Sequence, residues 1–125
     1  MAVDKKFAGY LCTGCGIGER LDAKQLTMVA TREGKMASCK SHPMLCSTEG
    51  VQLIRDDVAA GNATHVMIAA CSRRAKMEAF NFTDIAMSRA NLREGVIWLR
   101  PEGDEHQETT QEMADDYVRM ACAEV

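Results

Sequence analysis

The stretch Thr64-His-Val-Met-Ile-Ala-Ala70 decides the fold of this 125-residue chain. From Val66 onward it is apolar at every position, so both faces of an extended segment would be apolar. That pattern is typical of a strand in a parallel sheet whose two faces are covered by helices. Residues 64–70 therefore predict a central parallel strand.

Three further strands are predicted around this one. Phe7–Cys12 is a short apolar run, Lys35–Cys39 is a weaker candidate, and Gly95–Leu99 is the fourth. Helices are predicted between and after them, over residues 19–31, 47–60, 72–90 and 104–123. The order βαβαβαβα predicts a single α/β domain over residues 1–125, with a four-stranded parallel sheet and helices on both faces.

Local signals support two of these helices. Ser47 or Thr48 can cap a helix start, and Gly61-Asn62 provides its stop. The last helix carries four residues at a spacing that predicts a core-facing stripe: Met113, Tyr117, Met120 and Ala121. Five acidic residues are expected on solvated helix faces: Glu33, Asp56, Asp57, Asp115 and Asp116.

Composition excludes several classes of protein. The formal net charge of −3 argues against a nucleic-acid binder, and no apolar run is long enough to cross a membrane. The first residues do not resemble a signal peptide, so a cytoplasmic protein is expected. Six cysteines in such a chain favour metal or redox chemistry over disulfides. No catalytic triad, carboxylate pair or phosphate loop is evident, so the chain is not expected to be a complete enzyme.

The predicted layout gathers five of the cysteines at one edge of the sheet. Cys12, Cys39 and Cys71 are expected to end strands, Cys15 to lie in the first loop, and Cys46 to precede a helix. The carboxyl ends of parallel strands share one edge, which is where open α/β folds bind ligands. The sixth cysteine, Cys122, is expected to be a small buried hydrophobic residue on the last helix.

Three chemistries remain open for these thiols. A [4Fe–4S] cluster takes four thiolates from separated loops, whereas zinc sites pair two close C-x-x-C motifs. The chain has one such motif, Cys12-Thr-Gly-Cys15, which favours a cluster over zinc. A thioredoxin-like dithiol is the third alternative.

The loop after the first strand is rich in glycine. Gly14 and Gly16 flank Cys15 and are predicted to bend the loop around a bound group and offer it backbone N–H donors. The G-x-G-x-x-G dinucleotide motif is not met, because Glu19 stands where its third glycine belongs. A flavin or nicotinamide pocket built by this chain alone is therefore not expected.

Basic residues flank the candidate ligands. Lys40 and His42 lie near the second loop, and Arg73, Arg74 and Lys76 follow Cys71. They could neutralise a thiolate-bound cluster, contact an acidic partner or cofactor phosphate, or form an ordinary exposed helical turn. His42 is expected to be a turn residue, or a hydrogen-bond donor behind the ligands, rather than a ligand itself.

Four segments carry a family resemblance: Tyr10–Gly18, Cys39–Ser47, Val66–Arg73 and Asn91–Trp98. With the tail through Tyr117–Met120, they follow the order found in the N-terminal domain of the A-type subunits of heterodisulfide reductases, a family of iron–sulfur flavoproteins. The chain resembles that domain over nearly its whole length. The likeness is strongest to the quinone-interacting branch of sulfate reducers, the B-type subunit of their membrane-bound oxidoreductase.

The resemblance implies an electron-transfer domain with one [4Fe–4S] cluster, which can be lost in air. The matching ligand positions are Cys12, Cys15, Cys46 and Cys71. Many relatives have C-x-C where this chain has C-x-x-C, so Cys39 is kept as a reserve ligand. The family's FAD-binding and ferredoxin-like modules lie outside this chain, so FAD is expected only in a full-length protein, and those modules are the expected partners. A docking module for a flavoprotein partner, cofactor-free or holding zinc, is kept as an alternative function. Asn91–Glu94 would lie at the edge opposite the cysteines, as a structural element or a contact with those modules.

Overall fold

The computed structural model describes residues 6–71, 80 and 85–125. Its sheet has four strands, all parallel, in the order β2-β1-β3-β4. Their bounds are β1 Phe7–Cys12, β2 Ser38–His42, β3 His65–Ala70 and β4 Ala86–Asn91. The predicted α/β class and the central place of residues 64–70 are confirmed, because β3 pairs with strands on both of its sides.

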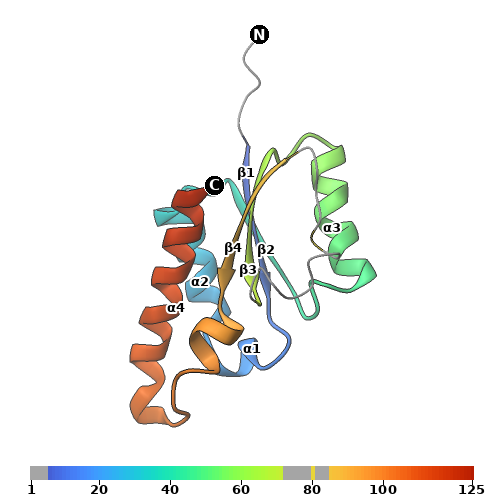
Figure 1. Ribbon diagram of the computed structural model, residues 1–125. Helices are drawn as coiled ribbons and strands as arrows, with labels where there is room; N and C mark the ends of the chain where they lie inside the picture. The colour runs from blue at the N-terminus through green and yellow to red at the C-terminus, as the bar shows by residue number, and fades with distance from the viewer. Residues whose placement is uncertain (1–5, 72–79, 81–84) are drawn as a thin grey trace.

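Helices cover both faces of this sheet, as predicted (Figure 1). One face packs against α3, and the other packs against α2 and α4. The helical segments are α1 Ile17–Arg20, α2 Ala23–Met28, the π-helix η1 Val29–Glu33, α3 Thr48–Ala59, the π-helix η2 Arg93–Ile97 and α4 Asp104–Glu124. Among the described residues, no helix is long and apolar enough to cross a membrane.

Alternation along the strands divides the core into two clusters. On β1, Tyr10 joins the cluster on the α3 side, whereas Leu11 joins the cluster under α2 and α4. On β3, Ile68 and Met67 divide in the same way. Residues 66–70 are buried on both faces, which is why this segment lacks the polar alternation of a half-exposed strand.

The fourth strand is not where the sequence predicts it. Gly95–Leu99 is helical or turn, while Ala86–Asn91 forms β4, so the helix predicted over residues 72–90 is wrong at its C-terminal end. The rest of that predicted helix lies outside the described residues. As the edge strand, β4 buries Ser88 and Ala90 and leaves Met87 exposed. The buried positions of this strand are therefore occupied by small residues, which do not stand out in the sequence as a hydrophobic alternation.

Two other elements differ in their bounds. The second strand begins at Ser38 rather than Lys35 and continues to His42. The predicted helix over residues 19–31 is divided at Leu21-Asp22, where the Asp22 side chain accepts hydrogen bonds from the Lys24 and Gln25 backbone N–H groups. A capping aspartate at this point starts a new helix.

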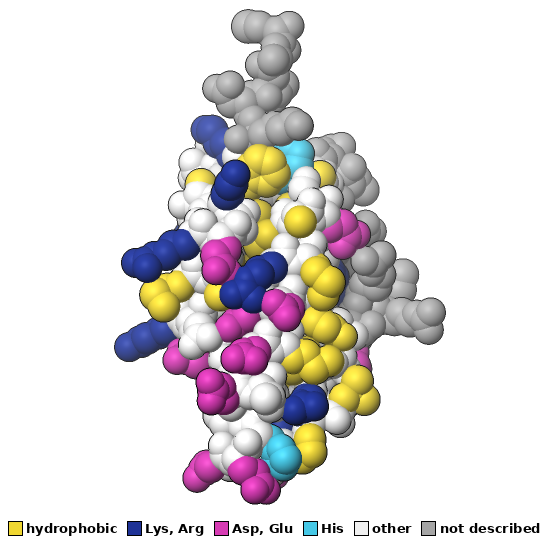
Figure 2. Space-filling view, turned by 90° about the vertical axis from the view of Figure 1, so that its left-hand side faces the viewer, with side chains coloured by type: hydrophobic (Ala, Val, Ile, Leu, Met, Phe, Trp, Pro, Cys, Tyr) yellow, Lys and Arg dark blue, Asp and Glu magenta, His cyan; other side chains and the backbone are white. Residues whose placement is uncertain are grey.

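The helices α3 and α4 form as predicted, with differences in which side chains are buried. Ser47 caps α3, and Gly61 adopts a left-handed conformation after it. On α4, Ala121 is buried, but Met120 is 59% exposed, so the predicted stripe is partly wrong. Acidic side chains gather on the outward face of α4 (Figure 2).

Two of the acidic residues expected in solvent are held inside the structure. Asp115 is buried and accepts hydrogen bonds from Gln25 Nε2 at 2.6 Å and Gln111 Nε2 at 3.0 Å, which joins α2 to α4. Asp57 accepts a hydrogen bond from the buried Tyr10 hydroxyl at 2.6 Å and pairs with Lys40 at 2.9 Å. Burial raises the pKa of Asp57, but the bonds from Tyr10 and Lys40 outweigh it, so its pKa is lowered.

Candidate metal centre

A cavity at the carboxyl edge of the sheet is lined by four thiols. Cys12 ends β1, Cys15 lies in the turn that follows, Cys46 directly precedes the Ser47 cap of α3, and Cys71 follows the last residue of β3. The other lining residues are Ile17, Ala70, Phe80 and Arg93. Four of the five cysteines expected at this edge are therefore brought together, although they are separated by up to 59 positions in the sequence.

The turn that carries Cys15 has an unusual backbone conformation. Cys15 has φ 53° and Gly16 has φ 83°, so two successive residues are left-handed. A β-carbon on Gly14 would lie 2.2 Å from the Pro43 carbonyl oxygen, so only glycine allows the two loops to meet there. The left-handed turn leaves Cys15 exposed, while Cys12 is buried.

The second loop is joined to this turn by backbone and side-chain bonds. The Thr13 N–H donates to the His42 carbonyl at 3.0 Å, and the Met44 N–H donates to His42 Nδ1 at 3.0 Å. His42 is thus the last residue of β2 and not the turn residue that the sequence predicts. Ser47 Oγ donates to the Met44 carbonyl and accepts from the Gly50 N–H, which fixes the backbone on both sides of Cys46.

Two arginines that sequence reasoning missed reach these thiols. Arg89 Nη2 donates to Cys71 Sγ at 3.0 Å, and Arg93 Nη1 donates to Cys15 Sγ at 3.6 Å. The pKa of Arg93 is raised, first by its hydrogen bond to Glu94 and also by its bond to Cys15. Since β4 ends at Asn91, the segment Asn91–Glu94 lies at the cysteine edge, and its predicted place at the opposite edge is wrong.

A capping signal marks this segment in the sequence. Asn91 Oδ1 accepts hydrogen bonds from the Glu94 N–H at 3.1 Å and the Gly95 N–H at 3.0 Å. Asparagine followed three residues later by glutamate is typical of a helix start. That signal predicts a helical turn at residues 93–97, and with it a strand that ends at about Asn91.

The other basic residues do not contact the thiols in the described structure. Lys40 is paired with Asp57 on the α3 side. Arg73, Arg74 and Lys76 lie outside the described residues, so their predicted role stays a prediction.

Cys39 and Cys122 lie toward the amino end of the strands. Cys39 is the second residue of β2 and pairs with Gly9, so its predicted place at the end of a strand is wrong. Cys122 is buried in the core under α4, as predicted. Burial raises the pKa of both thiols, that of Cys122 to about 11.

The four cysteines that line the cavity carry free thiols. All six cysteines are unpaired thiols. Within the described parts of the chain, no three His, Cys, Asp or Glu side chains are arranged to hold a single metal ion. The donor set that lines the cavity is all-sulfur, which suits zinc or an iron–sulfur cluster.

Fold and site together define a small parallel α/β domain with a thiol-lined cavity at the carboxyl edge of its sheet. No family model matches the chain. Curated relatives nevertheless align with more than nine-tenths of it, and these relatives are A-type subunits of heterodisulfide reductases.

Three of these relatives show the extent of the similarity. The chain is 30% identical to the A-type subunit of the H₂:CoB–CoM heterodisulfide, ferredoxin reductase of Methanothermobacter thermautotrophicus, over 91% of the chain and 18% of that protein. It is 28% identical to the second A-type iron–sulfur subunit of the CoB–CoM heterodisulfide reductase of Methanopyrus kandleri, over 91% of the chain and 18% of that protein. It is 29% identical to the A-type subunit of the ferredoxin/F₄₂₀H₂-dependent CoB–CoM heterodisulfide reductase of Methanosarcina acetivorans, over 91% of the chain and 15% of that protein. The chain thus spans less than a fifth of the length of these relatives.

Proposed function

We propose that this chain is an electron-transfer domain that binds one [4Fe–4S] cluster through Cys12, Cys15, Cys46 and Cys71. The observation that carries the proposal is the convergence of these four thiols, from the ends of β1 and β3 and from the loop before α3, on one cavity. Similarity to the A-type subunits of heterodisulfide reductases, one of which is named an iron–sulfur subunit, supports the same chemistry.

The protein's part is to hold and shield such a cluster. When bound, the cluster supplies a one-electron carrier. The buried Cys12 and Cys71 anchor it to β1 and β3, while Phe80 and Ile17 keep water from one side. The exposed Cys15 would form the outer side of the site.

The wider role is proposed from the similarity to A-type subunits of heterodisulfide reductases and from the resemblance seen in the sequence. We place the domain in a heterodisulfide-reductase-like or quinone-interacting oxidoreductase system, such as the branch of sulfate reducers that contains the B-type subunit, working in the reducing cytoplasm. Its partners would be modules that carry FAD and ferredoxin-like clusters. FAD itself would bind in those modules. Gly14 and Gly16 would instead bend the loop around the cluster and offer it backbone N–H donors.

Anaerobic reconstitution of the 125-residue chain with iron and sulfide tests the proposal. About four iron and four sulfide per chain are expected, with broad absorption near roughly 400 nm. One zinc per chain and no sulfide would instead support a zinc-binding docking module. A chain that takes up neither metal but cycles between a Cys12–Cys15 dithiol and disulfide would support a thioredoxin-like domain. Either of these results overturns the cluster proposal.

A further inference from the structure

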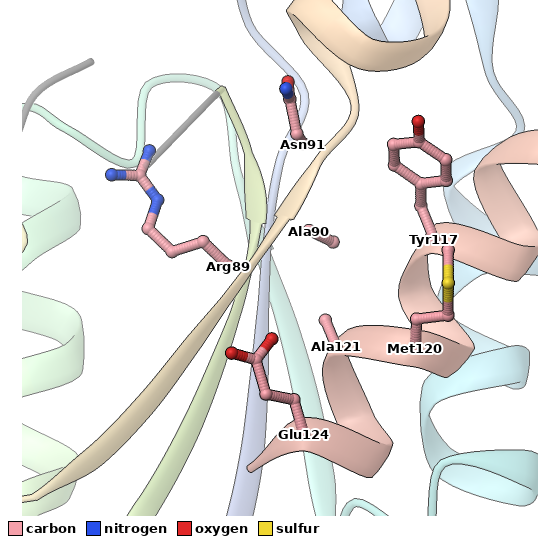
Figure 3. A pocket seen from close by; sticks show the side chains of 7 residues that line it. All are labelled: Arg89, Ala90, Asn91, Tyr117, Met120, Ala121 and Glu124. Atoms are coloured by element: carbon pink, nitrogen blue, oxygen red, sulfur yellow. The ribbon is translucent and has the colours of Figure 1, made fainter. Parts of the chain in front are cut away.

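Two guanidinium groups, one from β4 and one from the segment after it, reach sulfurs of the cysteine cavity. Arg89, which lines the pocket between β4 and α4, directs its guanidinium to the side of β4 opposite Ala90 and Tyr117 (Figure 3). Its Nη2 contacts both Cys71 Sγ and the Cys71 carbonyl oxygen at 3.0 Å. Arg93 lies two residues after the end of β4 and reaches Cys15 Sγ. The two arginines therefore serve different sulfurs of the cavity.

Both guanidinium groups are held in place by other contacts. Arg89 lies over the ring of Phe80, 4.8 Å from its centroid, and Arg93 lies over Trp98 at 4.7 Å. Arg93 Nε also pairs with Glu94 at 2.6 Å. Stacking on a ring and pairing with a carboxylate fix the direction of a planar guanidinium. The N–H groups directed at sulfur are thus oriented before any group binds.

We propose that Arg89 and Arg93 are positioning residues that set the reduction potential of the cluster through hydrogen bonds to Cys71 and Cys15. The inference rests on the proposed function. Reduction adds one electron from an external one-electron donor, such as dithionite, and leaves the cluster one unit more negative. Donors and positive charge beside the ligand sulfurs stabilise that state, so they raise the potential.

The central test is the midpoint potential of reconstituted chains. Arg93→Gln removes the charge and the donor to Cys15 and is expected to lower the ratio of reduced to oxidised cluster about tenfold at a fixed potential, which is about 59 mV for a one-electron couple. Arg93→Lys keeps the positive charge but lacks the planar guanidinium, so its midpoint potential should lie between those of Arg93→Gln and the unaltered chain. Arg89→Lys, chosen because loss of Arg89 could unfold its strand end, should also lower the potential.

Arg32→Gln is the matched control, because Arg32 is an exposed arginine on η1 and its loss makes the same change in charge. Its potential should equal that of the unaltered chain. Equal potentials in Arg93→Gln, Arg89→Lys and the unaltered chain, at full iron and sulfide content, would overturn the inference while leaving the proposed function intact.

A second measurement does not need the cluster. In the metal-free, reduced chain, the guanidinium beside Cys15 Sγ stabilises its thiolate. Alkylation of Cys15 at about pH 7 should therefore be severalfold slower in Arg93→Gln than in the unaltered chain or in Arg32→Gln. An unchanged rate would show that Arg93 does not act on this sulfur, whatever the chain binds. Failure of every chain, altered or unaltered, to take up iron and sulfide would count against the proposed function instead.

Discussion

The cysteines at the two ends of the sheet have different surroundings. At the carboxyl end, four thiols face a cavity, and two of them accept hydrogen bonds from arginines. Toward the amino end, Cys39 and Cys122 are packed into the core, and glycines leave room for their sulfurs. A β-carbon on Gly34 would lie 2.5 Å from Cys122 Sγ, and one on Gly9 would lie 3.3 Å from Cys39 Sγ. One fold thus uses cysteine as a hydrogen-bond acceptor at one end of the sheet and as a small apolar residue at the other.

The largest expected difference is in cluster content. Cys46→Ser or Cys71→Ser should lose nearly all of the reconstituted iron and sulfide, because a [4Fe–4S] cluster needs four thiolates. Cys39→Ala and Cys122→Ala are the matched controls at the other end and should keep the content of the unaltered chain. Loss of the cluster in Cys39→Ala, with Cys12→Ser still loaded, would make Cys39 the ligand and contradict the division between the two ends.

The layout of this site could be predicted from the sequence to a large extent, because it depends on strand ends. An apolar run marks a strand, and Cys12 and Cys71 lie at the ends of such runs. Cys39 was misplaced because β2 carries few apolar residues: Ser38, Lys40 and Ser41 gave no signal for where the strand begins and ends. Its pairing with β1 decides its register, and pairing is a tertiary interaction.

The arginines could not be predicted for a related reason. Gly95-Val-Ile-Trp-Leu99 has the composition of a strand, but Val96 and Ile97 are buried from a helical turn and Trp98 remains exposed. A strand at residues 95–99 would put Arg93 at the edge of the sheet opposite the cysteines and Arg89 within the preceding helix. In the structure, Arg89 lies on β4 and Arg93 follows it at the cysteine edge. Burial of small residues on one face of an edge strand leaves little pattern in the sequence.

Thiol reactivity gives the next largest effect. Burial raises the pKa of Cys122 to about 11, so this thiol stays protonated at about pH 8. Since only the thiolate reacts, alkylation of Cys122 in the metal-free native chain should be about a hundredfold slower than that of a free thiol with a pKa of about 8.5. Its rate should rise about tenfold per pH unit up to its own pKa.

Peptide mass spectrometry after a timed pulse of iodoacetamide measures these rates. Cys15, which is exposed, is the internal comparison from the other end of the sheet and should be labelled first. Labelling of Cys122 as fast as Cys15 at about pH 8, in a chain that remains folded, would mean that the amino end is open. The contrast between the two ends would then be lost.

A smaller effect is expected from the backbone of the Cys15 turn. Gly14→Ala forces a β-carbon against the Pro43 carbonyl oxygen, so the two loops must separate, at a cost of about 2 kcal/mol in the free energy of unfolding. It should also reduce iron loading, because Cys12 and Cys15 lie on either side of the displaced residue. Chemical denaturation and iron analysis check the two effects.

Gly61→Ala is the matched control for this change. Gly61 is left-handed, at φ 79°, but has open space around it, so alanine there costs about 1 kcal/mol of strain without touching a cysteine. Normal iron loading in both variants would show that the Cys15 turn tolerates movement and that close loop contact is not needed for the site.

The smallest predicted effect concerns the cap beside Cys46. Ser47→Ala removes the hydroxyl that accepts from the Gly50 N–H at 3.1 Å and donates to the Met44 carbonyl at 2.6 Å. Loss of a capping side chain costs about 1 kcal/mol. Asp22→Ala removes an equivalent cap from α2, away from the cysteines, and should destabilise the chain to a similar degree. Because Ser47 also fixes the backbone next to Cys46, only Ser47→Ala should slow cluster reconstitution. Equal reconstitution rates in the two variants would mean that the position of Cys46 is set by the rest of the loop and that the cap serves the helix alone.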